Sequence, residues 1–397
     1  MLRDALRLVG PPGTNKVMAG ELSRLIKRGL PGYRLPEPQK AGPGALVYPF
    51  ELAVAHLALW YARTPSRVLW DLYESEAARL EPLHDEIARD AASDQRGWCW
   101  DRATFSIRAR NLGGFAAGEL QVVGAVKNAL IAGAAARGIR LSVDPDRPDI
   151  LVALRMHDRT LAVSIDLAGQ AMHLRGYRRE AGAAPLRENL AAALVMLARF
   201  DARREILVDP LAGSGTIAIE AALMGRGEPL WRGAEPLAHR LPAFAGWPRR
   251  DEALFADTLP LVIANEIETR TVAAARANIA AAGMSERVVS LHGDFRQLTA
   301  ERIHKIARER GREGQGGVIL GNPPYGARLE KASDVVSLYR ELGAWCRQFP
   351  GWRAAFLVAH RDFEQAFGGR PRIVKPLANA NQPARFYLYD IGPAGAL

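Results

Sequence analysis

Cysteine and clustered histidine are scarce in this sequence. Its 397 residues include two cysteines, Cys99 and Cys346, and eight histidines that lie far apart. Neither set has the short ligand spacing of a zinc site or the cysteine density of a disulfide scaffold. We therefore expect no structural metal, and we expect two free thiols, as in a protein of the reducing cytoplasm.

Long hydrophobic runs are also missing. No apolar stretch reaches the roughly 20 residues that a membrane-spanning helix needs, and the first residues lack the charged and then apolar pattern of a secretion signal. Hydrophobic residues make up 48% of the chain and charged residues 24%, which is the balance of a folded globular protein. The length predicts two or three domains, and we expect no membrane partner.

Negative charge is in deficit. The chain has 53 Lys and Arg residues against 43 Asp and Glu, for a net charge of +10. This excess favours a polyanionic partner such as nucleic acid. Arginine greatly outnumbers lysine and alanine is abundant, as coding bias alone can produce, so the charge does not distinguish RNA from DNA.

The most informative motif is Asn322-Pro323-Pro324-Tyr325, which follows the apolar run 318–320. Proline donates no backbone N–H, so the Asn322 side-chain oxygen and the Pro323 carbonyl can both accept hydrogen bonds from an exocyclic amine. Tyr325 supplies a flat face for a base that has left its stack. An isolated motif of this kind is also compatible with a simple proline-rich turn, and the rest of the chain decides between the two.

A second motif joins a strand to a helix. The apolar residues 206–208 end in Asp209, then Gly213-Ser214-Gly215 forms a turn, and an apolar helix begins near Thr216. Glycines allow the backbone to approach a ligand closely, and a helix N-terminus favours polar or anionic groups. The glycine spacing also fits the dinucleotide fingerprint, so this motif alone is compatible with NAD, FAD and S-adenosylmethionine (SAM).

Acidic residues at three successive strand ends favour SAM. Asp209 is placed to accept from the ammonium group of a methionine moiety. Glu266 ends the strand that starts at residue 261, where it can bind ribose hydroxyls, and Asp294 follows strand 288–292, where it can bind the adenine amino group. Asn322 then stands at the end of a fourth strand, for which a dehydrogenase has no use. The four strand ends together predict SAM-dependent methylation of an exocyclic amine.

The remaining segments predict the domain organisation. Helices and strands alternate irregularly before residue 169, as in a small α+β unit rather than a Rossmann order. Residues 169–185 are predicted to form a linker that contains Arg175, Arg178 and Arg179, and residues 186–397 the catalytic domain. A long insertion at 226–259 is rich in Trp, Pro and Arg, a composition that suits stacking on single-stranded nucleic acid or, equally, local packing of the tryptophans.

The chain resembles the class I RNA methyltransferases that contain a THUMP domain, and most closely the bacterial large-subunit rRNA guanine-N2 enzymes. The resemblance extends from about Gly44 to the C-terminus, and the first 40 residues match poorly. The segments that carry it are 63–69, 148–150, 167–169, 173–178, 184–191, 209–216 and 321–326.

This resemblance implies a fold, a cofactor and a partner. It implies a Rossmann-like α/β methyltransferase domain after a smaller α+β region, with a ferredoxin-like segment at 1–50 and a THUMP fold at 51–168 that bind structured RNA. It also implies that the catalytic motif receives a guanine amine and that SAM contacts Asp209, Gly213, Ser214, Gly215, Thr216, Glu266, Asp294 and Asn322. The chain departs from the family pattern at Leu211-Ala212 in the glycine turn and at Ala264-Asn265 before an acid that is more often Asp.

Several alternatives stay open at this point. The same motifs suit a tRNA guanine-N2 methyltransferase, and the amine chemistry suits an adenine-N6 DNA methyltransferase, although no DNA-recognition domain is evident. A non-catalytic RNA-binding assembly factor would need none of the intact motifs. For Arg175, Arg178 and Arg179 we expect RNA phosphate contacts, whereas the alternative is that they clamp the domains through carboxylates.

Overall fold

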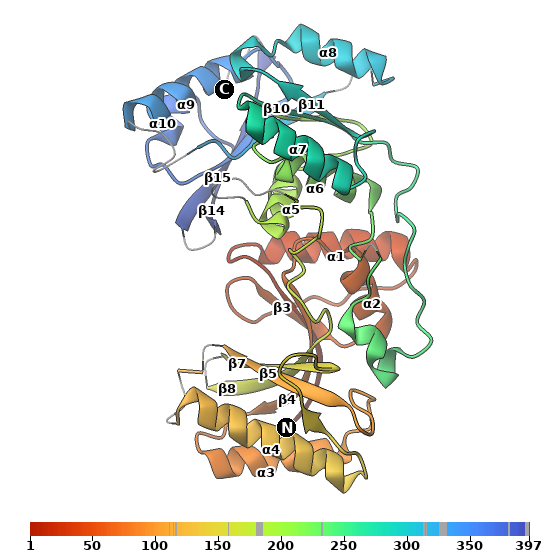
Figure 1. Ribbon diagram of the computed structural model, residues 1–397. Coiled ribbons are helices and arrows are strands. Elements are labelled where there is room, and N and C mark those ends of the chain that lie inside the picture. The colour runs from red at the N-terminus through yellow and green to blue at the C-terminus, as the bar shows by residue number, and fades with distance from the viewer. Residues whose placement is uncertain are drawn as a thin grey trace. The chain divides into compact units, whose positions relative to one another are not determined.

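The chain folds into two compact units (Figure 1). The N-terminal unit comprises residues 1–10, 18–172 and 229–251, and the C-terminal unit comprises 11–17, 173–228 and 252–397. This computed structural model describes residues 1–397 except 111, 114, 116, 158, 180–185, 232, 313, 315, 325–331, 380–381 and 394–396, and excepting also the side chains of 332 and 333.

The C-terminal unit is built on a seven-stranded sheet in the order β11-β10-β9-β12-β13-β15-β14. The first five of these strands are parallel, and β15 is antiparallel to both of its neighbours. Their bounds are β9 Ile206–Asp209, β10 Leu261–Glu266, β11 Val288–His292, β12 Gly317–Gly321, β13 Arg353–Val358, β14 Ile373–Asn379 and β15 Gln382–Asp390.

Two hydrophobic cores cover the two faces of this sheet. One core gathers residues of α5 and α6 with one set of alternate strand residues, and the other gathers residues of α8, α9 and α10 with the opposite set. Strands β9 and β12 are buried on both faces, which explains their continuous apolar runs. The predicted Rossmann-like α/β domain is therefore confirmed. The helices are α5 Glu188–Leu197, α6 Thr216–Arg226, α7 Thr269–Ala281, α8 Ala300–Glu309, α9 Ala332–Cys346 and α10 Phe363–Phe367.

The N-terminal unit is an α+β structure with a mostly antiparallel sheet in the order β2-β3-β1-β4-β8-β7-β5-β6. The boundary predicted at residue 50 falls between β3 and α2, and the assignment of ferredoxin-like and THUMP folds stays a prediction. The elements are β1 Leu2–Val9, α1 Asn15–Gly29, β2 Gln39–Lys40, β3 Ala45–Pro49, α2 Leu52–Tyr61, β4 Arg67–Ser75, α3 Leu80–Ser93, β5 Thr104–Arg110, α4 Glu119–Ala136, β6 Ser142–Val143, β7 Ile150–His157 and β8 Thr160–Asp166.

Residues 229–251, which form most of the insertion, pack in the N-terminal unit although they follow α6 in the chain (Figure 1). The Trp231 indole N–H donates to the Leu59 carbonyl at 2.8 Å, and the Ala243 amide donates to the Gly97 carbonyl at 3.0 Å. Trp231 is 7% exposed, so its ring packs inside this unit rather than presenting a stacking surface. Arg232 lies outside the described residues.

The described part of the chain has neither a membrane-spanning helix nor a metal-binding cluster. None of the helices there combines the length and the apolar character needed to cross a bilayer. The same residues hold no group of three or more His, Cys, Asp or Glu side chains arranged to bind a metal ion. Both cysteines are buried and unpaired by disulfides.

Candidate active site

The candidate site lies at the carboxyl ends of the central parallel strands of the C-terminal unit. Strand β9 pairs with β10 on one side and with β12 on the other, so the strand order reverses between β9 and β12. Ligands of open α/β sheets bind outside the carboxyl ends at such a switch point. Asp209, Glu266 and Asn322 all stand at these ends.

The glycine turn is hydrogen-bonded to the end of β10. Gly213 and Gly215 have φ values of +53° and +83°, which residues with a Cβ rarely adopt. The Gly213 amide donates to Glu266 Oε2 at 2.9 Å, and the Ala212 amide donates to the Asn265 carbonyl at 2.9 Å. The turn therefore leads directly into α6, whose first residue is Thr216.

Asp209 is a buried carboxyl group with few compensating contacts. It is 1% exposed, and Oδ1 accepts one backbone hydrogen bond, from Leu211 at 3.2 Å. Burial, together with the nearby Glu266 charge, raises the pKa of Asp209 to about 8. No cation of the described residues pairs with it, so the carboxyl group is suited to a cationic ligand group.

Glu266 and Asp294 are already engaged with the backbone. Glu266 Oε1 accepts from the amides of Ile267 and Glu268 at 2.8 and 3.0 Å, in addition to the Gly213 contact at Oε2. A carboxylate has about four acceptor positions, so about one is left for a hydroxyl group. Asp294 accepts from the Arg296 amide at 3.0 Å and pairs with its guanidinium at 2.8 Å.

The Asn-Pro-Pro motif follows β12 directly. Asn322 Oδ1 is buried and has no hydrogen-bond partner among the described residues. Pro323 is buried, and the Pro324 carbonyl accepts from the Tyr339 hydroxyl of α9 at 3.1 Å. Tyr325 lies outside the described residues. A buried acceptor without a donor is rare in folded proteins, and it indicates a place for a ligand N–H group.

Comparison with known proteins shows the family of this chain. The family described as the RMKL-like methyltransferase domain matches residues 175–385, which is more than half of the chain. The chain belongs to this family. The predicted methyltransferase identity is therefore confirmed, whereas the THUMP assignment stays a prediction.

Individual relatives extend the similarity beyond that domain. The ribosomal RNA large subunit methyltransferase K/L of Methylococcus capsulatus is 30% identical over 358 residues, which cover 86% of this chain and 46% of the relative. The chain thus spans about half the length of this curated relative.

Two solved structures match almost the whole chain. A "possible methylase" from Clostridium difficile has a TM-score of 0.75 at 28% identity, with 98% of each chain covered. SMU.472, solved in complex with S-adenosylhomocysteine, has a TM-score of 0.78 with the same coverage. Its identity of 23% shows the shared fold alone.

This member of the RMKL-like family also contains site residues that the motifs did not reveal. Asn265 is 2% exposed, and its amide group donates to the Gly293 carbonyl at 2.9 Å and to the Pro210 carbonyl at 3.3 Å. Asn278 of α7 donates to the Ser214 carbonyl at 3.1 Å. These two amides connect the glycine turn to the loop before Asp294 and to α7. The departure at Ala264-Asn265 was the visible signal for the first of them.

The linker arginines face carboxylates of the C-terminal unit. The Arg175 guanidinium lies 3.5 Å from Glu220, and its side chain is 3% exposed. Arg178 donates to Glu188 at 2.9 Å and to Thr216 Oγ1 at 3.3 Å. The Arg179 amide donates to Asn278 Oδ1 at 2.8 Å. These carboxylate contacts lie within the C-terminal unit and do not join the two units. RNA contact stays a prediction for Arg175, Arg178 and Arg179.

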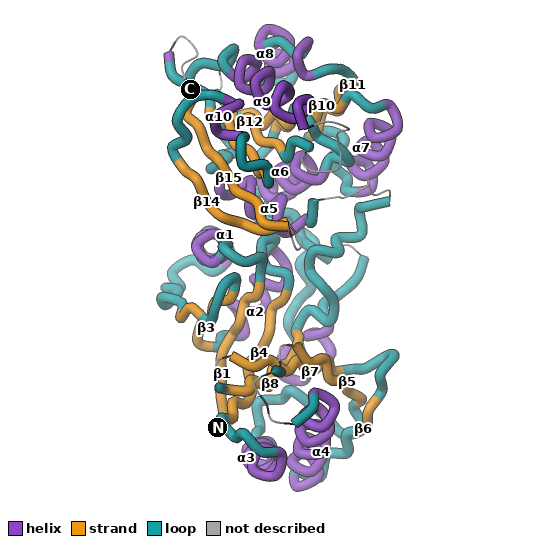
Figure 2. The backbone as a smooth tube through the Cα atoms, turned by 90° about the vertical axis from the view of Figure 1, so that its left-hand side faces the viewer, coloured by secondary structure: helices purple, strands orange, loops and turns teal. Residues whose placement is uncertain are grey.

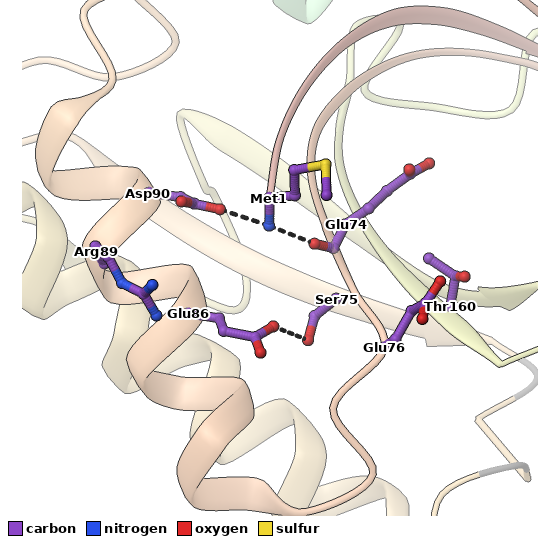
Figure 3. Close-up of a pocket in the computed structure, with 8 residues that line it drawn as sticks. All are labelled: Met1, Glu74, Ser75, Glu76, Glu86, Arg89, Asp90 and Thr160. Atoms are coloured by element: carbon purple, nitrogen blue, oxygen red, sulfur yellow. Dashed lines mark hydrogen bonds and ion pairs between the residues drawn. The ribbon is translucent and has the colours of Figure 1, made fainter.

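A cavity of about 500 Å³ lies in the N-terminal unit, and none of its lining residues belongs to the strand ends described above (Figure 3). Its lining includes Glu74, Glu86 and Asp90, and the Met1 ammonium group pairs with Asp90 at 2.6 Å. Carboxylates repel anionic ligands, so this cavity does not suit nucleic acid.

Proposed function

We propose that this protein transfers a methyl group from SAM to the N2 amine of guanine in structured RNA, with large-subunit rRNA as the substrate. The observation that carries the proposal is the buried Asn322 Oδ1, which lacks a donor among the described residues at the end of β12. A base amine supplies that donor. The neighbouring strand β9 ends in Asp209, which can hold the methyl donor.

The cofactor cradle is proposed to form from the strand ends and the glycine turn. Asp209 would accept from the SAM ammonium group, Glu266 from a ribose hydroxyl, and Asp294 from the adenine amine. Gly213 to Thr216 would lie against the methionine part at the N-terminus of α6. The raised pKa of Asp209 supports this role. Burial disfavours the charged carboxylate, and a bound ammonium group would stabilise it.

The proposed mechanism rests on orientation of the amine. The lone pair of a guanine N2 amine is delocalised into the ring, so the amine is a weak nucleophile. Asn322 Oδ1 and the Pro323 carbonyl would accept from its two N–H bonds, direct the lone pair outward and stabilise the positive charge that grows on nitrogen. When bound, SAM supplies an electrophilic methyl group. Holding the amine about 3–3.5 Å from that carbon contributes through proximity.

The relatives and the net charge support an RNA partner. The Methylococcus relative is named a large-subunit rRNA methyltransferase, and the chain carries a net charge of +10. We propose that the N-terminal unit supplies RNA affinity, as a THUMP-containing region would, in a cytoplasmic protein. A tRNA guanine-N2 methyltransferase of the same architecture is the main alternative, because the catalytic motif is the same for both.

Product analysis tests the proposal. The purified chain would be incubated with labelled SAM and, separately, with rRNA fragments, total tRNA and duplex DNA, and the nucleosides would be identified by mass spectrometry. We expect N2-methylguanosine in rRNA. The same product in tRNA alone would favour the tRNA methyltransferase. N6-methyladenine in DNA would show an adenine-N6 DNA methyltransferase instead. RNA binding without methyl transfer would indicate an assembly factor.

A further inference from the structure

One face of the N-terminal sheet carries several arginines. Helices α3 and α4 lie against one side of strands β4, β5, β7 and β8 (Figures 1 and 2). Residues that alternate along these strands point to the other side. On that side β5 contributes Thr104, Ser106, Arg108 and Arg110, all at least partly exposed, whereas Phe105 of the helix side is fully buried.

Strand register brings a third arginine beside them. Arg110 pairs with Arg155 of β7, and Arg108 pairs with Ala153. Neighbouring strands lie about 4.8 Å apart, and alternate residues of one strand are about 7 Å apart. Arg108, Arg110 and Arg155 therefore form one group of cations, which we call the arginine face.

Three acids on this side of the sheet lie beside other arginines. Asp71 of β4 pairs with Arg7 at 2.7 Å. Glu74 lies 3.6 Å from Arg3. Asp166 of β8 pairs with Arg67.

The described residues place no carboxylate against the arginine face. Among the residues that the structure describes, none forms an ion pair or hydrogen bond with the guanidinium of Arg108, Arg110 or Arg155. Burial, followed by the charges of Arg7 and Arg110, lowers the pKa of Arg155. Uncompensated like charges at this spacing repel one another, and a bound anion would relieve that repulsion.

We propose that the arginine face binds the phosphate backbone of the RNA substrate. Guanidinium groups match phosphate oxygens in a two-pronged geometry. The row of cations continues into the hydroxyl of Ser106, a group that contacts phosphates and sugars in nucleic-acid complexes. A row of this kind suits a repeating polyanion better than the isolated carboxylate of an acidic protein. The inference rests on the proposed RNA substrate and names the surface that holds it.

The test compares two double variants of the full-length chain. Arg108→Gln/Arg110→Gln removes two charges from the arginine face, and Arg79→Gln/Arg89→Gln removes two charges at exposed positions at the start of α3 and within it. Binding of a fluorescent rRNA hairpin would be followed by anisotropy from 50 to 300 mM salt. We expect at least a tenfold loss for the first variant at about 100 mM salt and less than a twofold loss for the control. The slope of log affinity against log salt should become shallower by about 1.5, since each phosphate contact contributes about 0.7–0.9.

Three results would overturn the proposal: an unchanged affinity in the arginine-face variant, an equal loss in the α3 control, or polyglutamate of matched charge binding as tightly as the hairpin, which would point to an acidic protein. SAM affinity, measured by calorimetry on each variant, separates this question from the proposed reaction. SAM binding or product formation could fail in the unmutated chain while the difference in RNA affinity between the variants persists. The proposed RNA-binding surface would then be supported and the proposed methyl transfer would be wrong.

Discussion

The candidate site of the C-terminal unit and the arginine face of the N-terminal unit differ in the kind of polar group that has no counter-charge or hydrogen-bond donor among the described residues. In the C-terminal unit these groups are buried acceptors, Asp209 and Asn322 Oδ1. In the N-terminal unit they are cations at the surface, such as Arg108 and Arg110. A buried acceptor requires one donor at a fixed position, whereas exposed cations neutralise a polyanion with little positional demand. Chemistry and RNA affinity should therefore be separable by mutation.

Replacement of Asn322 tests the buried acceptors most directly. Asn322→Ala removes the oxygen that orients the amine, so we expect turnover to fall by about 10²–10³, or about 3–4 kcal/mol, by analogy with the loss of one oxyanion-hole donor. SAM affinity by calorimetry and hairpin affinity by anisotropy should stay within twofold. Near-normal single-turnover rates would mean that Asn-Pro-Pro is only a turn.

Asp209 should couple SAM binding to a proton. Its pKa of about 8 means that the carboxyl group is mostly protonated at pH 7, and pairing with an ammonium group would lower that pKa. SAM affinity should therefore rise from pH 6 to 8, with release of close to one proton at pH 7. Calorimetry in two buffers of different ionisation enthalpy measures this release, and Asp209→Asn should abolish it while weakening SAM binding roughly 10- to 100-fold.

The same group predicts an effect on stability. The pKa of Asp209 is raised in the folded chain above its unfolded value near 4, so between pH 4 and 8 the folded state holds a proton that the unfolded state has lost. The contribution of Asp209 to the free energy of unfolding therefore declines as pH rises, by up to about 1.4 kcal/mol per pH unit. Asp209→Asn cannot ionise and should unfold at a higher temperature than the unmutated chain at pH 8. An equal or lower melting temperature would contradict the raised pKa.

The strand ends could be predicted from the sequence because parallel strands that are buried on both faces are short apolar runs, and each run here stops at a polar residue. The contacts of Asn265 and Asn278 could not be predicted, because their partners, the Gly293 and Ser214 carbonyls, lie 28 and 64 residues away along the chain. The arginine face shows the same limit. The alternation of Arg108 and Arg110 is visible in the sequence, but the position of Arg155 beside them depends on the pairing of β5 with β7.

The linker arginines extend this comparison, because Arg178 pairs with a carboxylate whereas Arg108 and Arg110 of the arginine face are exposed. Arg178→Ala leaves Glu188, which is 5% exposed, without its guanidinium. A charged hydrogen bond of about 1.5–3 kcal/mol corresponds to a melting temperature lower by roughly 4–10 °C. The salt slope of RNA binding should not change.

Arg179→Ala is the matched control for that variant, because its backbone contact with Asn278 survives the substitution. We expect its melting temperature to stay within about 1 °C. A shallower salt slope in Arg179→Ala would add this residue to the RNA contacts. A shallower slope in Arg178→Ala at unchanged stability would support the phosphate prediction for Arg178 and contradict a purely structural role for its contact with Glu188.

The smallest expected effect concerns Tyr339, which supports the catalytic motif from α9. Its hydroxyl donates to the Pro324 carbonyl at 3.1 Å, and its ring is fully buried. Tyr339→Phe keeps the ring and removes the donor, a loss worth about 0.5–1.5 kcal/mol for a neutral hydrogen bond. We expect kcat to fall about three- to tenfold with an unchanged KM for SAM.

Tyr389→Phe is the control for Tyr339, since the Tyr389 hydroxyl is buried and has no partner among the described residues. This variant should keep kcat and gain slightly in stability, because it removes an unsatisfied polar group. If both variants lower kcat equally, the effect comes from core packing. If Tyr339→Phe alone lowers kcat, the hydroxyl holds the proline carbonyl and, through it, the orientation of Asn322.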